Sequence, residues 1–485
     1  MSVPAPSQPK AASRAAEAAG VVAAAFVPYL PYTKVLSSES NRRLMFYTHA
    51  DALALLALVV STIAVFAGAW LALKRLPDRF GAAARRCAVS GAIGLSLLNL
   101  SALFRPIGSD AGYATNYIVL ALLTVAIAGW DRTHRVFARV ASFAARFVAP
   151  APAVFLLFLF VAPEHPPFTT PSSARHDETE SSQGPVYIFL FDCMDAGIAI
   201  QEPKGREHAP NLHAFLHEAT YFERSESPGT TTANSVPSFL FQNKGSYDVE
   251  DGVYYLIRDG TRTPTSEMTS LYEQLDTGKS FKVLGGWYLD YRTLFGERLD
   301  WLHTTSYEKP LMRSFDELVW FAVAQSTHYG FVPLLRGISG IGDLSFVPHV
   351  QNTRQIHQHA LEVIADRGND VIAFFHYPVP HSPYVFERNG PRPPGQPAIT
   401  NEQAAYRMNL EYADTLLGEL LLAVKKAGRW SDATIVVMSD HGLRNTNCVF
   451  VVKMPGQTSP VTVVEPVSTA EFLGWLKDRG HPRVR

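Results

Sequence analysis

The sequence predicts a bundle of transmembrane helices followed by an α/β domain whose sheet is mostly parallel. Long uncharged stretches fill the first third of the chain, and apolar strands alternate with helical segments after residue 185. Charge follows the same division, with 15 basic and 7 acidic residues up to Thr170, and 28 and 37 beyond it. The net charge of −1 therefore combines a basic part and an acidic part.

Composition excludes several classes of protein. Charged residues make up 18% of the 485 residues and apolar residues 47%, whereas soluble proteins usually have about 25% charged residues. Such a chain is neither disordered nor dedicated to nucleic acid, so we expect no nucleic-acid partner. Three cysteines are too few for a disulfide-built scaffold or a cysteine-rich zinc module.

The first 163 residues read as a membrane bundle. Four uncharged stretches lie between charged residues, at 52–73, 87–104, 111–130 and 147–163. About 20 apolar residues cross the hydrocarbon core, and soluble helices rarely stay apolar around their whole circumference. A fifth stretch, 18–33, is shorter and contains two prolines. It could be a kinked span, an interfacial helix or a signal-peptide core, so we expect four or five helices.

Basic residues between the spans orient the bundle. The loop after the first span carries five, the loop before the last span carries four, and the loop between them has only Arg105. Positively charged loops stay cytoplasmic. The last span therefore exits outward, and we expect a multi-pass inner-membrane protein whose remainder is extracytoplasmic. Residues 164–184, rich in Pro, Ser, Thr and charge, read as a linker.

Residues 185–485 read as one α/β domain. Three short apolar runs suit buried parallel strands, at Val186–Phe191, 371–375 and Thr434–Met438. Helical spacing of apolar residues covers 403–427 and stops at Gly428, and a helix-like stretch lies around 358–365. Ser468 and Glu471 form a capping box that opens a C-terminal helix through Leu476. The alternation predicts a mostly parallel sheet covered on both faces.

Ionisable residues follow three of these strands. Asp192 ends the first, Asp440 and His441 follow the run at 434–438, and His376 and His381 follow the run at 371–375. Active sites of such sheets lie beyond the carboxyl ends of the strands. An Asp at one strand end usually caps a helix, but two Asp and a His at one edge suit a divalent cation.

A hydroxyl-rich loop supplies a candidate nucleophile. Residues 229–237 read GTTTANSVP and lead into an apolar segment. Hydroxyls at a helix N-terminus meet free backbone N–H groups and the helix dipole, which stabilise an alkoxide or a bound phosphate. An ordinary Ser/Thr-rich turn with a helix cap would read the same way.

The order of these features resembles the sulfatase and alkaline-phosphatase superfamily. An Asp at the first strand end, the GTTTANSVP loop, a PHSPY segment and finally TIVVMSDHG occur in that order from residue 185 to the C-terminus. The resemblance is greatest to the membrane-anchored branch, the phosphoethanolamine transferases and lipoteichoic-acid synthases of bacteria. It implies an alkaline-phosphatase-like, doubly wound fold and places the bundle in a bacterial inner membrane.

The resemblance also implies roles for single residues. Thr232 would be the nucleophile and a metal ligand, and Asp192, Asp440 and His441 would complete the site of one divalent ion (Zn, Mn, Mg or Ca). His381, and with it His376, would bind the transferred group or protonate the leaving group. Ser235 and Arg444 are further candidates for substrate binding, although Arg444 could equally be a solvated surface residue.

The chain also departs from its relatives. Formylglycine sulfatases need an Arg two residues after the Pro of the C/S-x-P-x-R motif, where this chain has Phe239. The loop after His441 is too short for a second metal site, because strand-like residues resume at 449. Cys193 and Cys448 could pair or remain two buried thiols. The aromatic-rich stretch 285–302 could shape a pocket or serve packing.

These features predict transfer, or hydrolysis, of a phosphate-containing head group through a covalent phosphothreonine. Tethering to the membrane favours a phospholipid donor, with an envelope glycan or lipid as acceptor. Two alternatives stay open: a sulfatase-type hydrolase of sulfate or phosphate esters, and a non-catalytic binding protein.

Overall fold

The structure is a computed structural model that describes residues 49–77, 184–250, 253–275, 280–289, 291–295, 298–304, 347–366, 370–393 and 401–481. The chain divides into two units. One comprises Met1–Pro166 and Lys309–Val347, and the other comprises Pro167–Glu308 and Pro348–Arg485.

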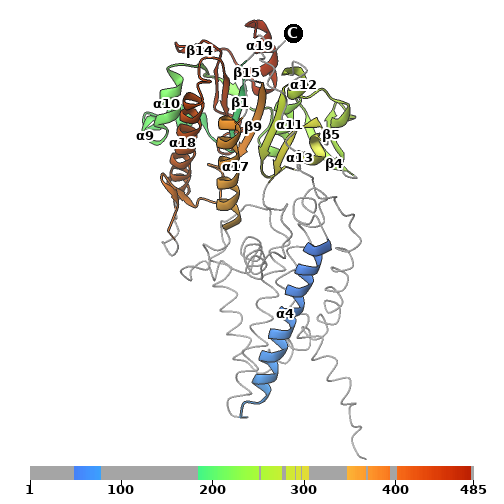
Figure 1. The fold of residues 1–485 in the computed structure, drawn as a ribbon. Coiled ribbons are helices and arrows are strands. Elements are labelled where there is room, and N and C mark those ends of the chain that lie inside the picture. Colours follow the sequence, from blue (N-terminus) through green and yellow to red (C-terminus); the bar gives the residue numbers. More distant parts are fainter. Residues whose placement is uncertain are drawn as a thin grey trace, which may run out of the picture. The chain divides into compact units, whose positions relative to one another are not determined.

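One helix of the first unit is described, α4 (His49–Lys74), and it contains the predicted first span (Figure 1). Val60, Val65 and Leu71 on this helix are each more than half exposed. No helix in the described residues is both long enough and apolar enough to cross a membrane. The stretches 18–33, 87–104, 111–130 and 147–163, and the linker before Gly184, lie outside the described residues.

A sheet of eight strands organises the second unit. Its order is β14 (Val461–Val463), β2 (Thr220–Phe222), β13 (Phe450–Lys453), β12 (Thr434–Met438), β1 (Val186–Phe191), β9 (Val371–Tyr377), β7 (Phe281–Gly286) and β8 (Trp301–Thr304). β13 is antiparallel to both neighbours, and the other neighbouring pairs are parallel. The sheet is therefore mixed and mostly parallel, as the sequence predicts.

The three predicted strands are present in the structure. β1 and β12 have the predicted bounds, and β9 extends the third run by two residues. His376 and Tyr377 continue the pairing of β9 with Leu190 and Phe191 of β1. The polar His376 ends the apolar pattern in the sequence, yet it is wholly buried in the sheet.

Successive side chains of β1 point alternately into two hydrophobic cores, one on each face of the sheet. Tyr187, Phe189 and Phe191 face one cluster, and the side chains between them face the other. We call these the first face and the second face. The first face is covered by α10 (Pro210–Leu216), α17 (Val347–Asp366) and α18 (Glu402–Lys426). The second face is covered by α11 (Thr232–Leu240), α12 (Leu271–Leu275), α13 (Tyr291–Phe295) and α19 (Phe472–Asp478) (Figure 1).

Helix boundaries follow local signals. Asn401 caps α18 by accepting a hydrogen bond from the N–H of Ala404, and Gly428 adopts a φ of +69° just past its end. Glu471 accepts a hydrogen bond from the N–H of Ser468, as in the predicted capping box, and a short 3₁₀ turn leads into α19. α17 is longer than the predicted 358–365.

Shorter elements complete the second unit. They are η2 (Gly197–Gln201), α9 (Gly205–His208), β3 (Ser225–Glu226), β4 (Ser246–Glu250), β5 (Val253–Arg258), β6 (Thr261–Pro264), η3 (Thr265–Glu267), β10 (Phe386–Glu387), β11 (Gly390–Pro391), β15 (Val467–Ser468) and η7 (Thr469–Glu471). β4, β5 and β6 form a separate antiparallel sheet, and β3 pairs with β15.

Candidate metal centre and nucleophile loop

Three adjacent parallel strands, β12, β1 and β9, deliver the candidate site. Asp192 follows β1 directly, Asp440 is the second residue after β12, and His376 is the penultimate residue of β9. Because the strands are parallel and adjacent, their carboxyl ends meet at one edge of the sheet. The predicted convergence of these residues therefore follows from the strand order.

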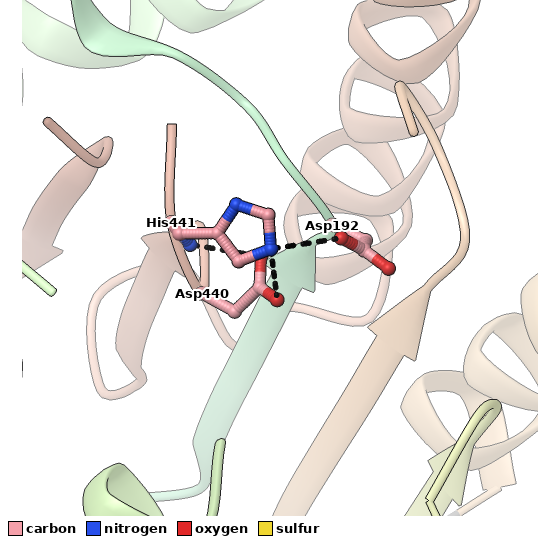
Figure 2. A group of neighbouring side chains, drawn as sticks. All are labelled: Asp192, Asp440 and His441. Carbon is pink, nitrogen blue, oxygen red and sulfur yellow. Dashed lines mark hydrogen bonds and ion pairs between the residues drawn. The ribbon is translucent and has the colours of Figure 1, made fainter. Parts of the chain in front are cut away.

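Asp192, Asp440 and His441 form the centre. Their ligand atoms all lie within 4.8 Å of one another, and all three residues are buried. Nε2 of His441 lies 3.3 Å from Oδ2 of Asp440 and 3.9 Å from Oδ1 of Asp192. Figure 2 shows one nitrogen of the His441 ring directed toward both carboxylates. In the described part of the chain this is the one group of three or more such side chains with suitable spacing.

The unpaired atoms of the centre fit a divalent cation. Among the residues that the structure describes, Oδ1 of Asp192 and Oδ2 of Asp440 are buried without a hydrogen-bond partner. Leaving buried carboxylate oxygens unpaired is costly. Nδ1–H of His441 donates to the carbonyl of Gly442 at 2.9 Å, which leaves the lone pair on Nε2. Two carboxylates and an imidazole are ligands that divalent cations accept.

Backbone groups orient Asp440. Its Oδ1 accepts hydrogen bonds from the N–H groups of Cys193 and His441, both at 2.9 Å, so that Oδ2 is directed to the centre. Cys193 adopts a φ of +67°, a conformation that non-glycine residues rarely adopt. Such outliers concentrate at functional sites.

Charge and burial oppose each other in the centre. Burial alone would raise the pKa of Asp192, but His381, His376 and His441 outweigh it and hold that pKa at about 2. Burial and the charge of Asp192 raise the pKa of Asp440. Burial lowers the pKa of His441, but the two carboxylates more than reverse this and raise it. Two repelling carboxylates in a buried site favour the presence of a positive charge.

The turn after His441 is braced by Asp195. Oδ2 of Asp195 accepts from the N–H of Leu443 at 3.0 Å and from Nδ2 of Asn445 at 2.8 Å. Its Oδ1 accepts from the N–H of Ile198 at 3.2 Å, at the start of η2. A Cβ on Gly442 would lie 2.1 Å from Oδ1 of Asn445, so the turn requires glycine there. Sequence reasoning missed this bracing, because the turn and Asp195 are far apart in the chain.

Thr232 is the first residue of α11 and is buried, whereas the preceding Thr231 is exposed. The N–H of Ser227 donates to the carbonyl of Thr446 at 2.9 Å, so the loop before α11 runs beside the turn that follows His441. α11 packs on the second face, toward which alternation also directs Asp192. The loop before α11 and the turn after His441 are therefore neighbours, and the predicted role of Thr232 stays a prediction.

Ser235 closes the nucleophile loop. Its hydroxyl accepts from the hydroxyl of Ser227 at 2.8 Å and donates to the carbonyl of Gly229 at 3.0 Å. The side chain is buried and both of these bonds stay within the loop. Its predicted substrate contact stays a prediction.

The backbone of His381 is hydrogen-bonded to the backbone of Asp192, a residue of the centre. Its N–H donates to the carbonyl of Asp192 at 3.1 Å. Nδ1–H of its ring donates to the carbonyl of Ser382 at 2.6 Å, so the lone pair lies on Nε2. The half-buried ring lies 6.3 Å from that of Trp287, centroid to centroid. An imidazole held this way can exchange a proton with a bound group.

His376 lies beside Asp192 inside the protein. Its Nε2 is 3.8 Å from Oδ2 of Asp192, its Nδ1 is 2.6 Å from the hydroxyl of Tyr291, and the side chain is wholly buried. The predicted contact of His376 with substrate stays a prediction. In the structure the His376 ring lies against Asp192, a candidate metal ligand.

Arg444 and the two cysteines have other partners. The guanidinium of Arg444 donates to both carboxylate oxygens of Glu402, at 2.7 and 2.8 Å, and is exposed. Its predicted role in substrate binding stays a prediction. Within the described residues Cys193 and Cys448 are free and buried, so of the two alternatives the structure shows two buried thiols.

Two aromatic residues near the centre, His349 and Tyr288, were not predicted individually as site residues. The ring of His349 on α17 lies 5.6 Å from that of Trp287, and its Nε2 is buried with no hydrogen-bond partner in the described residues. Burial, together with the charge of His381, lowers the pKa of His349 to about 3. Burial and the charges of Asp192 and Asp440 raise the pKa of Tyr288. The aromatic stretch signalled Tyr288, whereas no motif surrounds His349.

This geometry defines an α/β domain with a candidate Asp/Asp/His metal centre at the carboxyl edge of its sheet. Residues 186–450 match the family model described as Sulfatase, and the chain belongs to the sulfatase family. The membership in the sulfatase family, expected from the resemblance, is confirmed.

Solved structures resemble the chain at low identity. The phosphonate monoester hydrolase of Agrobacterium radiobacter is 14% identical, over 61% of this chain and 73% of that one, with a TM-score of 0.41. The lipoteichoic acid synthase from Listeria monocytogenes is 12% identical, over 62% and 72%, with a TM-score of 0.39. A 2-O GAG sulfatase is 11% identical, over 59% and 68%, with a TM-score of 0.41. No curated protein sequence matches this chain.

Proposed function

We propose that the protein is a membrane-anchored, metal-dependent enzyme that transfers or hydrolyses a phosphate-containing head group through a covalent phosphothreonine at Thr232. One observation carries the proposal. Buried oxygens of Asp192 and Asp440 lack partners in the described residues, beside the lone pair of His441. That arrangement suits a divalent ion. The hydrogen bond between Ser227, in the loop before Thr232, and Thr446, in the turn after His441, supports the assignment of the nucleophile to Thr232.

The first step is attack by Thr232. Its Oγ1 forms a bond to phosphorus while the ester bond between phosphorus and the donor's leaving oxygen breaks, which gives phosphothreonine and the donor's alcohol. A divalent ion held by Asp192, Asp440 and His441 would neutralise phosphoryl charge and lower the pKa of the hydroxyl. The free N–H groups at the start of α11 would add to the stabilisation of phosphoryl charge.

His381 would move the protons. In the first step Nε2 of His381, which carries a lone pair, would take the proton that Oγ1 of Thr232 loses and give it to the leaving oxygen. In the second step Nε2 would take the proton of the acceptor hydroxyl or water that attacks phosphorus, and give it to Oγ1 as the bond between phosphorus and Thr232 breaks. The same residue therefore acts as base and then as acid in each step.

Membrane anchoring and a lipid donor form a separate part of the proposal. Four uncharged stretches in the sequence support it. A site tethered to a membrane meets phospholipid at high effective concentration. We propose a bacterial inner-membrane location, an extracytoplasmic catalytic domain, a phospholipid donor and an envelope glycan or lipid acceptor.

The location can be tested by fractionation. We expect the full-length chain to sediment with membranes and to resist a carbonate wash. A protease added to spheroplasts should degrade the catalytic domain. Recovery of the chain in the soluble fraction would contradict anchoring, and a protected domain would contradict the orientation.

The covalent step can be tested by mass. The full-length protein, loaded with divalent metal and incubated with membrane phospholipid, should gain a mass that peptide mapping places on Thr232. Thr232→Ala should lose both the adduct and turnover, whereas Thr231→Ala, a change at the exposed neighbour, should keep both. Full activity of Thr232→Ala would eliminate the assignment.

Sulfatase-type hydrolysis is the second candidate function. Membership in the sulfatase family favours it, but Phe239 occupies the position of the motif's Arg. Release of sulfate from aryl sulfates, with no reaction of phospholipid, would establish this alternative. A protein without turnover or stoichiometric metal would be a non-catalytic binding protein.

A further inference from the structure

We propose that Tyr291 and His376 form a buried relay that positions Asp192 for metal binding, by holding one carboxylate oxygen while the other is directed to the metal. This inference rests on the metal centre of the proposed function. It assigns His376 a positioning role and concerns how this chain's own residues prepare the centre.

The relay is a series of polar atoms buried between α13, which begins at Tyr291, and the main sheet. The hydroxyl of Tyr291 lies 2.6 Å from Nδ1 of His376, and Nε2 of the same ring lies 3.8 Å from Oδ2 of Asp192. Tyr291 and His376 are wholly buried, and Asp192 is 1% exposed. The rings of Tyr291 and His376 meet edge to face, at an interplanar angle of 89°.

Hydrogen-bond directions follow from the partners. A buried phenol must donate its proton, and among the described residues the one hydrogen-bond partner of the Tyr291 hydroxyl is Nδ1 of His376. Nδ1 therefore accepts, and a neutral imidazole with an accepting Nδ1 carries its hydrogen on Nε2. That N–H faces Oδ2 of Asp192. At 3.8 Å it attracts the carboxylate electrostatically without reaching hydrogen-bond distance.

The two oxygens of Asp192 thus have different neighbours. Oδ2 faces His376, and Oδ1 faces Nε2 of His441 at 3.9 Å. Oδ1 has no hydrogen-bond partner in the part of the chain that the structure describes, which leaves it available as a ligand. His376 is also absent from the group whose ligand atoms lie within 4.8 Å of one another in the described residues. The geometry therefore favours His376 as a support for Asp192 over His376 as a ligand.

Packing specifies the position of Tyr291. A Cβ on Gly286 would lie 2.5 Å from the Tyr291 ring, so the strand β7 approaches the ring more closely than any other residue type would allow. Tyr291 also packs edge to face against Phe374, two residues before His376 on β9. The relay is thus held by two neighbouring strands of the main sheet, β7 and β9.

The test is binding of Co²⁺ alone to the purified full-length chain, followed by visible absorption. Substitution of a residue that orients a metal ligand typically lowers the affinity for the metal about 10–100-fold. We expect His376→Leu to weaken Co²⁺ binding by about this factor and Tyr291→Phe by about 10-fold. His376→Gln, whose amide can donate to Asp192, should recover part of the loss. The position of the Co²⁺ band should not move, because the ligand set is unchanged.

Tyr272→Phe is the matched control. Tyr272 is another buried tyrosine of the second face, but its hydroxyl donates to the carbonyl of Val283 at 2.7 Å, away from the centre. This variant should bind Co²⁺ with the affinity of the wild type, even if it loses as much thermal stability as Tyr291→Phe does. If His376→Leu does not fold, Tyr291→Phe carries the test, since it removes a single oxygen atom.

Four outcomes would contradict the proposal in whole or in part. Affinity of Tyr291→Phe equal to that of Tyr272→Phe would remove Tyr291 from it. A shift in the position of the Co²⁺ band of His376→Leu, measured at saturating Co²⁺, would make His376 a ligand. A wild type that binds no Co²⁺ would remove the metal centre and, with it, the proposed function. Normal metal binding in all variants would overturn the relay alone, because the phosphothreonine test does not depend on it.

Discussion

Oδ2 of Asp440 lies 3.3 Å from Nε2 of His441 and, within the described residues, is buried without a hydrogen-bond partner. The other oxygen, Oδ1, is satisfied by two backbone N–H groups. The carboxylate is thus oriented by the backbone, with one oxygen left for a cation.

Asp440→Asn should separate metal binding from stability. Affinity for divalent metal should fall by more than about 100-fold, because a ligand is lost rather than an outer-shell partner. The metal-free variant should be more stable than the metal-free wild type, on the order of 1 kcal/mol, because the repulsion from Asp192 is relieved. Calorimetric titration and chemical unfolding in chelator measure the two effects.

Asp432→Asn is the control for that prediction. Asp432 is exposed and lies just before β12, at the opposite end of the strand from Asp440. It should change neither quantity. Undiminished metal affinity in Asp440→Asn would contradict the centre described here.

Ser235→Ala distinguishes the two hydroxyls of the nucleophile loop. Ser235 bonds to Ser227 and Gly229 inside the loop, so its removal should lower the free energy of unfolding by about 1–2 kcal/mol. The mass adduct on Thr232 should still form. If Ser235→Ala instead abolishes the adduct while the protein stays folded, Ser235 is required for the covalent step. Urea unfolding and intact-protein mass spectrometry decide between these results.

Gly442→Ala should disrupt the turn that follows His441. The added Cβ would lie 2.1 Å from Oδ1 of Asn445 and 2.4 Å from the carbonyl oxygen of Asn447, neither of which can move without breaking the turn. We expect a loss of about 3 kcal/mol or more in stability and weaker metal binding.

Gly474→Ala is the matched control. Gly474 lies inside α19 with no atom within 4 Å of the added Cβ, so the substitution should stabilise the protein by about 0.5–1 kcal/mol. Equal effects of the two substitutions in thermal unfolding would show that the turn tolerates a side chain.

His349 should make stability depend on pH. Its pKa is lowered from 6.5 to about 3, so between these values the unfolded chain binds a proton that the folded chain excludes. Its contribution is therefore complete above pH 6.5 and is lost progressively as the pH falls toward 3. Between pH 6.5 and pH 5 the loss should reach about 2 kcal/mol.

His349→Gln should remove this part of the pH dependence. Unfolding free energies of the wild type and the variant, each measured at pH 7 and pH 5, give the contribution as a difference of differences. Parallel pH profiles for the two proteins would show that His349 is not excluded from protonation in the folded state.

Local sequence patterns were enough to predict most residues of the centre. β1 and β12 are continuous apolar runs, so their ends, and with them Asp192, Asp440 and His441, could be located without coordinates. Because parallel strands end at one edge, their convergence followed as well. Residues 305–346, for which the sequence offered no element, also lie outside the described residues.

Only the tertiary structure decided how side chains far apart in the chain pair. It brought Tyr291 to His376, Asp195 to the turn after His441, and Arg444 to Glu402. It also made β13 antiparallel and left two buried free thiols. Hydrophobic periodicity reports which face of a helix or strand is buried, but it does not record which distant polar atom will meet another there. That choice depends on packing between elements, which no local pattern contains.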